Sequence, residues 1–341
     1  MRHACLAIGL SLWALAAAAL EVEDRRVLQG TGDAVLRILS TADLDVFDPY
    51  LTAFQATAPE VTLDYAVVSS AELHRAVRSG AAFDVAISSA MDLQFQLAND
   101  GLARRHRSPA TDALPPWGRW RHSIFAFAAE PAVVVVDLAR FDGLPLPTTR
   151  QELIEILRDN PSRFGGAVGT YDIRESGLGY LFATQEARAT DAYWRLAEVM
   201  GRLAPRLYCC SAEMIDDVAD GPLAVAYNVL GSYAADRLAR RADGRLRILP
   251  MAGFSNVILR TALIPAAAEE PRLAGRFVDM LVTTGLRTEP GAWTLPPLGQ
   301  VEVQAAAGLG PIRLGPALMV HLDPLNRRSF LEEWENAVEQ R

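Results

Sequence analysis

Apolar residues along the chain alternate between two patterns, a short β-rich run and a longer helix-like run. Residues 35–40, 61–70 and 83–89 have the composition of strands, and each leads through a polar loop into a segment whose apolar positions recur every three to four residues. Strands that alternate with helices of this length favour parallel βαβ units over a β-sandwich. The pattern therefore predicts an α/β fold.

The middle of the chain interrupts this plan before it resumes. Residues 115–141 contain two apolar runs separated by Glu130 and Pro131, and residues 245–265 predict a pair of strands that returns the chain to its first half. A chain of 341 residues also exceeds the usual size of one hydrophobic core. We therefore expect two lobes, the first formed by residues 21–129 and 251–341 and the second by residues 130–250.

The first twenty residues indicate the cellular compartment of the protein. Basic residues precede an apolar stretch at positions 4–15, and small residues follow up to an acidic segment. This order is typical of a secretory signal peptide with a cleavage site near residues 17–19. An uncleaved anchor is the alternative, although the stretch could barely span a bilayer. Residues 1–20 are therefore expected to be a signal peptide, and the mature protein to be periplasmic.

The amino-acid composition and the net charge disfavour some classes of binding partner. Half of the residues are hydrophobic and 22% are charged, which suits a folded globular protein. The formal net charge is −8 and is spread along the chain rather than held in a tail. This distribution does not favour nucleic acid or an anionic membrane surface as a partner.

Polar residues gather where the predicted strands end. In open α/β sheets ligands bind beyond the carboxyl ends of the strands, and helices that start there direct unpaired N–H groups at the same space. Arg174, with these helix N-termini, could hold an anion. Each hydroxyl could instead be a helix N-cap, and Arg174 could pair with Glu175. The candidate ligand-binding residues are Ser40, Thr41, Asp43, Ser70, Ser88, Ser89, Thr170, Tyr171, Arg174, Ser176, Tyr227 and Asn228.

Signatures of catalysis are absent from the sequence. The chain has no G-x-S-x-G, H-E-x-x-H, Walker or G-x-G-x-x-G motif in the required context. We therefore expect no enzyme activity, no cofactor and no metal, with a secreted hydrolase or isomerase as the alternative. The adjacent Cys209 and Cys210 could form a disulfide in an oxidising compartment or stay as two buried thiols.

Two segments resemble a known family. FDVAISSAMD (83–92) is similar to a strand-plus-loop segment of periplasmic solute-binding proteins of ABC transporters, and GPLAVAYNVLGSYA (221–234) is similar to a strand and following helix of the same proteins. The chain resembles the group that includes ferric-iron-, hexose-phosphate- and phosphoglycerate-related binding proteins. This resemblance implies a two-lobed type II fold, in which each lobe is a mixed sheet flanked by helices and a cleft separates the lobes.

The resemblance also implies a function. A monomer would capture a small anionic solute, such as a phosphorylated sugar, an organic acid or another oxyanion, by closure about hinges near residues 128–131 and 250–255. It would deliver the solute to an ABC permease in the inner membrane. Sensing through a two-component histidine kinase is the alternative role. Ferric iron is disfavoured because Val229 and Leu230 replace the two adjacent tyrosines of the iron-binding members.

Overall fold

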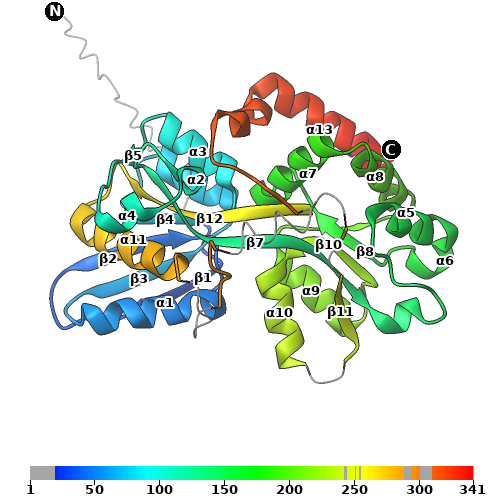
Figure 1. The fold of residues 1–341 in the computed structure, drawn as a ribbon, viewed down its shortest axis with the longest axis horizontal. Coiled ribbons are helices and arrows are strands. Elements are labelled where there is room, and N and C mark those ends of the chain that lie inside the picture. The colour runs from blue at the N-terminus through cyan, green and yellow to red at the C-terminus, as the bar shows by residue number, and fades with distance from the viewer. Residues whose placement is uncertain are drawn as a thin grey trace, which may run out of the picture.

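One mixed sheet runs through both halves of the molecule and carries the helices of two lobes (Figure 1). The computed structural model describes residues 20–241, 244–249, 251–252, 255–287, 294–299 and 309–340. The predicted signal peptide, residues 1–20, lies outside these ranges except for its last residue.

The first lobe is built from βαβ units, as the sequence predicts. The predicted strands are present as β2 (Val35–Ser40), β3 (Thr62–Val67) and β4 (Val85–Ser88). Strand β2 lies between the other two and is parallel to both. The other elements before the crossing to the second lobe are β1 (Asp24–Leu28), α1 (Leu44–Thr57), α2 (Ser70–Arg78), α3 (Met91–Asn99), β5 (Ala103–Arg104), α4 (Pro109–Ala113), η1 (Pro116–Gly118) and β6 (Arg119–Trp120).

A single long strand, β7 (Ile124–Asp137), passes from one lobe into the other. Its first part pairs with β12 (Ser255–Pro265) as far as Pro131, and from Ala132 onward it pairs with strands of the second lobe. The change of partner falls between Pro131 and Ala132, and the lobe boundary between residues 129 and 130 stays a prediction. Part of the second predicted hinge, residues 250–255, lies outside the described residues.

The second lobe repeats the strand-to-helix plan. Its elements are η2 (Leu138–Phe141), α5 (Arg150–Asp159), α6 (Pro161–Phe164), β8 (Val168–Tyr171), α7 (Gly177–Ala189), α8 (Ala192–Arg202), β9 (Arg206–Tyr208), α9 (Ser211–Asp220), β10 (Val225–Leu230), α10 (Gly231–Arg240) and β11 (Leu246–Leu249). In the described residues the strands follow the order β1-β3-β2-β4-β12-β7-β10-β8-β9. Strand β8 is parallel to β9 and β10, whereas β10 is antiparallel to β7, so this lobe also has a mixed sheet.

The C-terminal segment of the chain contacts both lobes. After β12, helix α11 (Pro271–Gly285) and strand β13 (Leu309–Pro311) pack on elements of the first lobe. The next segment, η3 (Pro316–Leu322), packs on α3, but α13 (Pro324–Val338) packs on α8 of the second lobe (Figure 1). The buried apolar face of α13 holds it there. Residues 251–341 therefore do not all belong to the first lobe.

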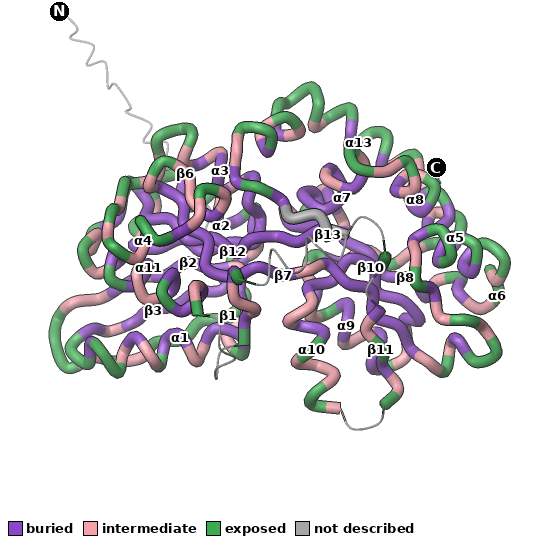
Figure 2. Tube along the Cα trace, in the orientation of Figure 1, coloured by how far each residue is buried: buried purple, intermediate pink, exposed green. Residues whose placement is uncertain are grey.

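The buried residues lie along the sheet and on the inner faces of the helices. Figure 2 shows buried residues along the central strands of both lobes, with exposed residues on the outer faces of the helices. All fourteen residues of β7 are buried except Pro131, because other elements cover both faces of this strand. In the part of the chain that the structure describes, no helix is long and apolar enough to cross a membrane.

Asp92, in the first turn of α3, is a buried carboxyl group close to the C-terminal segment. One of its oxygens accepts the backbone N–H of Leu93 at 2.9 Å. Burial raises the pKa of Asp92 to about 7, and the nearby positive charge of Arg327 on α13 only partly opposes this. Burial raises the pKa of Tyr180 on α7, and the negative charge of Asp92 adds to this effect.

Asp92→Asn is expected to stabilise the protein at alkaline pH. The unfolded carboxyl ionises near pH 4 and the folded one near pH 7, so the wild-type protein loses stability as the pH rises through this interval. The variant should therefore gain about 2–4 kcal/mol over wild type at pH 8, and the gain should vanish towards pH 4. Urea unfolding at pH 5 and pH 8 measures the difference. A gain that is equal at both pH values would contradict this account of Asp92.

Candidate functional site

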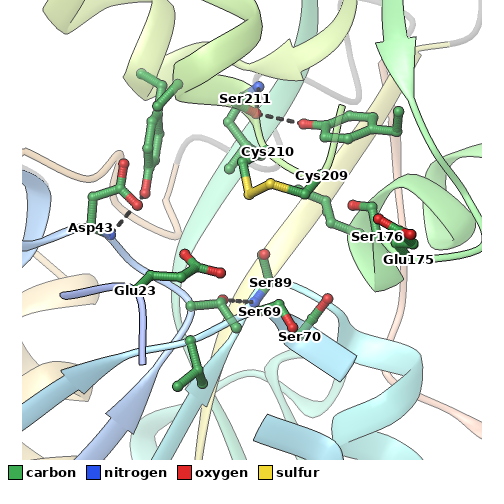
Figure 3. A pocket seen from close by; sticks show the side chains of 17 residues that line it. Glu23, Asp43, Ser69, Ser70, Ser89, Glu175, Ser176, Cys209, Cys210 and Ser211 are labelled. Atoms are coloured by element: carbon green, nitrogen blue, oxygen red, sulfur yellow. Dashed lines mark hydrogen bonds between the residues drawn. A yellow bond between two sulfur atoms is a disulfide. The ribbon is translucent and has the colours of Figure 1, made fainter. Parts of the chain in front are cut away.

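A pocket lies between the lobes, where the strands of both sheets end (Figure 3). Strands β2, β3, β4, β8, β9 and β10 all direct their carboxyl ends to it. The space between its lining atoms, open solvent included, is about 560 Å³. The lining residues are Glu23, Thr41, Asp43, Val68, Ser69, Ser70, Ser89, Tyr171, Glu175, Ser176, Leu178, Cys209, Cys210, Ser211, Ala212, Leu230 and Tyr233.

Helices from both lobes begin at this pocket. Ser69 caps α2 by accepting the N–H of Glu72 at 3.1 Å, and Ser176 caps α7 by accepting the N–H of Gly179 at 3.2 Å. Helices α1, α3 and α9 also start at or directly beside lining residues. The free N–H groups and the positive dipole ends of these helices create a favourable environment for an oxyanion.

Two hydroxyl groups differ in their availability to a ligand. The Ser89 side chain has no hydrogen-bond partner among the described residues, and in Figure 3 it points into the space between the lobes. Ser211, by contrast, lies 2.5 Å from the Tyr171 hydroxyl and accepts the N–H of Leu230 at 3.1 Å. Ser89 can therefore bind a solute directly, whereas Ser211 and Tyr171 support the wall.

The charged side chains that line the pocket are all acidic. They are Glu23 and Asp43 from the first lobe and Glu175 from the second. Burial raises the pKa of Asp43, and burial together with the negative charge of Asp43 raises the pKa of Glu23. With no basic side chain in the lining, an oxyanion would have to bind through N–H and O–H donors. The three carboxylates would oppose a solute with several negative charges.

The lobes are in contact across the pocket. The N–H of Gly177 donates to the Ser70 hydroxyl at 3.0 Å, which joins the start of α7 to the start of α2. On the other side, the N–H of Asp43 donates to the Tyr233 hydroxyl at 3.1 Å. An ion pair of 3.0 Å between Asp45 of α1 and Arg240 of α10 adds a third contact. The two lobes therefore touch each other on both sides of the pocket.

Half of the predicted site residues line this pocket, and several others lie behind it. Those in the lining are Thr41, Asp43, Ser70, Ser89, Tyr171 and Ser176. Ser40 and Ser88 lie one residue too early, and their hydroxyls accept the backbone N–H groups of Ala42 and Ala90. Thr170 and Asn228 are buried within β8 and β10 and are not in the lining.

The predicted role of Arg174 needs a correction. Its guanidinium binds both carboxylate oxygens of Asp172, at 2.8 and 2.6 Å, and donates to Glu339 near the C-terminus at 2.5 Å. It also lies over the ring of Trp334 on α13. These contacts fix Arg174 against the C-terminal helix rather than in the pocket. Its structural role is to hold α13 on the second lobe.

Tyr227 is also placed away from the pocket. Its hydroxyl donates to Glu186 at 2.8 Å and accepts from Arg150 at 2.7 Å, inside the second lobe. Tyr233 reaches the pocket, but its hydroxyl accepts the N–H of Asp43. Among the residues that the structure describes, no group of three or more His, Cys, Asp or Glu side chains is arranged to hold a metal ion.

Sequence reasoning did not select several lining residues. Cys209 and Cys210 form a disulfide that faces the pocket, so the structure decides between the two alternatives left open for this pair. Ser211 follows directly at the start of α9, and the helix-start signal that identified Ser176 could have found it. Glu23 precedes the first strand, and nothing in its local sequence indicates the pocket.

Several solved structures of other proteins resemble this chain. No protein-family model and no curated protein matches the chain. A substrate-binding protein of an ABC transporter from Agrobacterium tumefaciens is 29% identical, with a TM-score of 0.85 over 92% of this chain and 98% of that one. AfuA from Actinobacillus pleuropneumoniae, with fructose-6-phosphate bound, is 15% identical, with a TM-score of 0.68 over 92% and 100% of the two chains. Iron-bound HitA from Pseudomonas aeruginosa is 16% identical, with a TM-score of 0.65 over 89% and 99%.

These relatives confirm the two-lobed fold and the predicted resemblance to periplasmic binding proteins of ABC transporters. The last two are too distant in sequence to carry more than the fold. The Agrobacterium protein, similar over nearly the whole chain, indicates a substrate-binding protein of an ABC transporter. The Agrobacterium relative is a substrate-binding protein, and AfuA is a periplasmic binding protein.

Proposed function

We propose that this protein, which has the fold of the ABC-transporter substrate-binding proteins, captures a small solute with one oxyanion group between its lobes. It would deliver the solute to an ABC permease of the inner membrane, which supplies the ATP hydrolysis. The observation that carries the proposal is the convergence of helix N-termini from both lobes on one pocket between them. In this role the protein acts as a periplasmic monomer.

The oxyanion is held by groups from both lobes. Backbone N–H groups at the starts of α2, α3, α7 and α9, together with the Ser89 hydroxyl, surround it. Such groups bind carboxylate and phosphate oxygens without a basic side chain. Because helices of both lobes contribute, the bound anion also favours the closed arrangement of the lobes.

The acidic side chains of the pocket narrow the class of solute. Glu23, Asp43 and Glu175 repel a second negative charge on the ligand. A phosphorylated sugar carries close to two charges at neutral pH, whereas a monocarboxylate carries one. Of the two solute classes expected from the sequence, the pocket therefore favours the organic acid.

A thermal-shift screen of the mature protein tests the proposal. The panel comprises short carboxylates, hydroxy acids, amino acids, sugar phosphates, phosphoglycerates, inorganic phosphate and sulfate, neutral sugars and Fe(III). A solute at one hundred times its Kd should stabilise the protein by about 2.7 kcal/mol, which is a shift of several degrees in Tm. We expect the largest shift with a monocarboxylate. Shifts confined to neutral sugars or to Fe(III) would overturn the proposal.

Two variants test whether the anion binds in the pocket. Ser89→Ala removes a hydroxyl that has no partner among the described residues, and should weaken the best monocarboxylate about tenfold by calorimetry. Arg174→Ala is the matched control, because its guanidinium binds Asp172 and Glu339 outside the pocket. That variant should lower Tm while changing the affinity less than about twofold. A tenfold loss in Arg174→Ala, with Ser89→Ala unchanged, would place the anion elsewhere.

A further inference from the structure

The disulfide between Cys209 and Cys210 forms part of the ligand pocket. The pair joins β9 to α9, and Cys210 is the residue that precedes the helix. Cys209 is exposed and Cys210 is half-buried. Figure 3 shows their sulfur atoms in the space between the lobes, on the opposite side from Ser69 and Ser89 of the first lobe.

A disulfide has a different chemistry from the rest of the lining. Eleven of the seventeen lining side chains carry a hydroxyl or carboxylate group, which forms strong hydrogen bonds. Two bonded sulfur atoms carry no hydrogen to donate, and they are soft, weak acceptors. Leu178, Ala212 and Leu230 lie in the same lining and add carbon atoms to it. The second lobe therefore presents an apolar patch, beside its own Glu175, Ser176 and Ser211, opposite the serines of the first.

The covalent bond also makes this wall rigid. Two free cysteines could each turn between rotamers, whereas a bond between neighbouring residues closes a small ring and holds both side chains in place. A surface that is already ordered loses little conformational entropy when a solute binds. Contact with carbon atoms of the solute should therefore contribute to affinity with little opposing cost.

We propose that the Cys209–Cys210 disulfide recognises the non-polar part of the solute, and that the solute is a monocarboxylate with a short aliphatic chain. This inference rests on the proposed function, because the helix N-termini and Ser89 hold the carboxylate while the chain of the solute lies on the disulfide. The disulfide selects among organic acids by the length and shape of their carbon chains.

An unbranched series of acids tests the inference. Acetate, propionate, butyrate and valerate are titrated by calorimetry into the oxidised mature protein, and into the Cys209→Ser/Cys210→Ser double variant. In the oxidised protein each added methylene should raise the affinity about fourfold, until the chain fills the pocket. In the double variant, whose serine hydroxyls are polar, the gain should fall below about twofold per methylene. Cys209→Ala/Cys210→Ala is the control that restores apolar atoms without the bond, and its gain should lie between the two.

A second measurement needs no variant. The rate at which a water-soluble phosphine reduces the wild-type disulfide is followed by thiol labelling, with acetate or butyrate at equal fractional saturation. If the chain covers the sulfur atoms, butyrate should slow the reduction at least about tenfold more than acetate. Equal rates would overturn the inference even if the serine variant failed to fold.

The outcomes separate this inference from the proposed function. If acetate or inorganic phosphate binds but chain length has no effect, or has the same effect in the serine variant, the role of the disulfide is wrong and the oxyanion site stands. If no acid of the series and no panel anion binds, the oxyanion site itself fails and the inference fails with it.

Discussion

Replacing Glu130 by glutamine is expected to destabilise the protein by about 3–5 kcal/mol, because it leaves a buried arginine without its counter-charge. Glu130 and Arg260 are both 0% exposed, and one carboxylate oxygen lies 2.9 Å from Nε and 2.7 Å from Nη2 of Arg260. The other oxygen accepts the Ser232 hydroxyl of α10. This cluster lies where β7 and β12 pass between the lobes.

Arg260 cannot escape the penalty by losing its proton. Burial by itself would lower its pKa, but the negative charge of Glu130 more than compensates, and the pKa of Arg260 lies above its ordinary value. Chemical unfolding of Glu130→Gln against wild type measures the loss. Glu269→Gln is the matched control, because its 2.8 Å pair with Arg37 is exposed and should contribute less than about 1 kcal/mol. A Glu130→Met/Arg260→Met protein should recover much of the loss, since it removes both charges. Equal effects of the two glutamine substitutions would contradict this account.

Gly177→Val is expected to weaken solute binding about a hundredfold by preventing full closure of the lobes. A Cβ atom at position 177 would lie 2.7 Å from the Ser70 hydroxyl and 2.9 Å from a methyl group of Leu93. Both neighbours belong to the first lobe, whereas Gly177 starts α7 of the second. A branched side chain therefore has to move the lobes apart. If closure falls to about one molecule in a hundred, apparent affinity falls by the same factor.

Calorimetry with the best solute of the thermal-shift panel measures this loss, and small-angle X-ray scattering shows whether the saturated variant stays open. Gly177→Ala should lose less than about tenfold, because the Ser70 and Leu93 side chains can shift by a few tenths of an ångström. Gly315→Val is the control, since a Cβ there meets nothing within 4 Å. Wild-type affinity and a compact liganded state in Gly177→Val would show that the Ser70–Gly177 contact does not control closure.

The sequence predicted the parts of the site that follow from local order. Thr41, Ser89 and Ser176 each come after a strand and before or at the start of a helix, and the carboxyl ends of these strands meet at the pocket. Ser40 and Ser88 were chosen by the same rule but lie one residue earlier, where the hydroxyl closes a turn within its own loop. The order of strand and helix identifies the loop, and the backbone conformation decides which hydroxyl of that loop lines the pocket.

The positions of Arg174 and Tyr227 were harder to predict, because most of their hydrogen-bond partners are distant in the sequence. Arg174 is held by Glu339, 165 residues further along the chain, as well as by Asp172 nearby. Tyr227 forms its hydrogen bonds with Arg150 and Glu186 on two different helices. No local pattern reports which of several carboxylates an arginine will meet, since this depends on how the helices pack.

By itself the sequence determined the α/β class, the order of strands and helices, and the presence of two lobes, because periodic burial is a property of neighbouring residues. Only the tertiary structure decided that α13 packs on the second lobe, that Arg174 faces this helix, and that the Cys209–Cys210 disulfide faces the pocket between the lobes. Each of these features depends on contacts between segments far apart in the chain. Such contacts are selected by the shape and charge of packed surfaces, which a local pattern of polar and apolar residues does not contain.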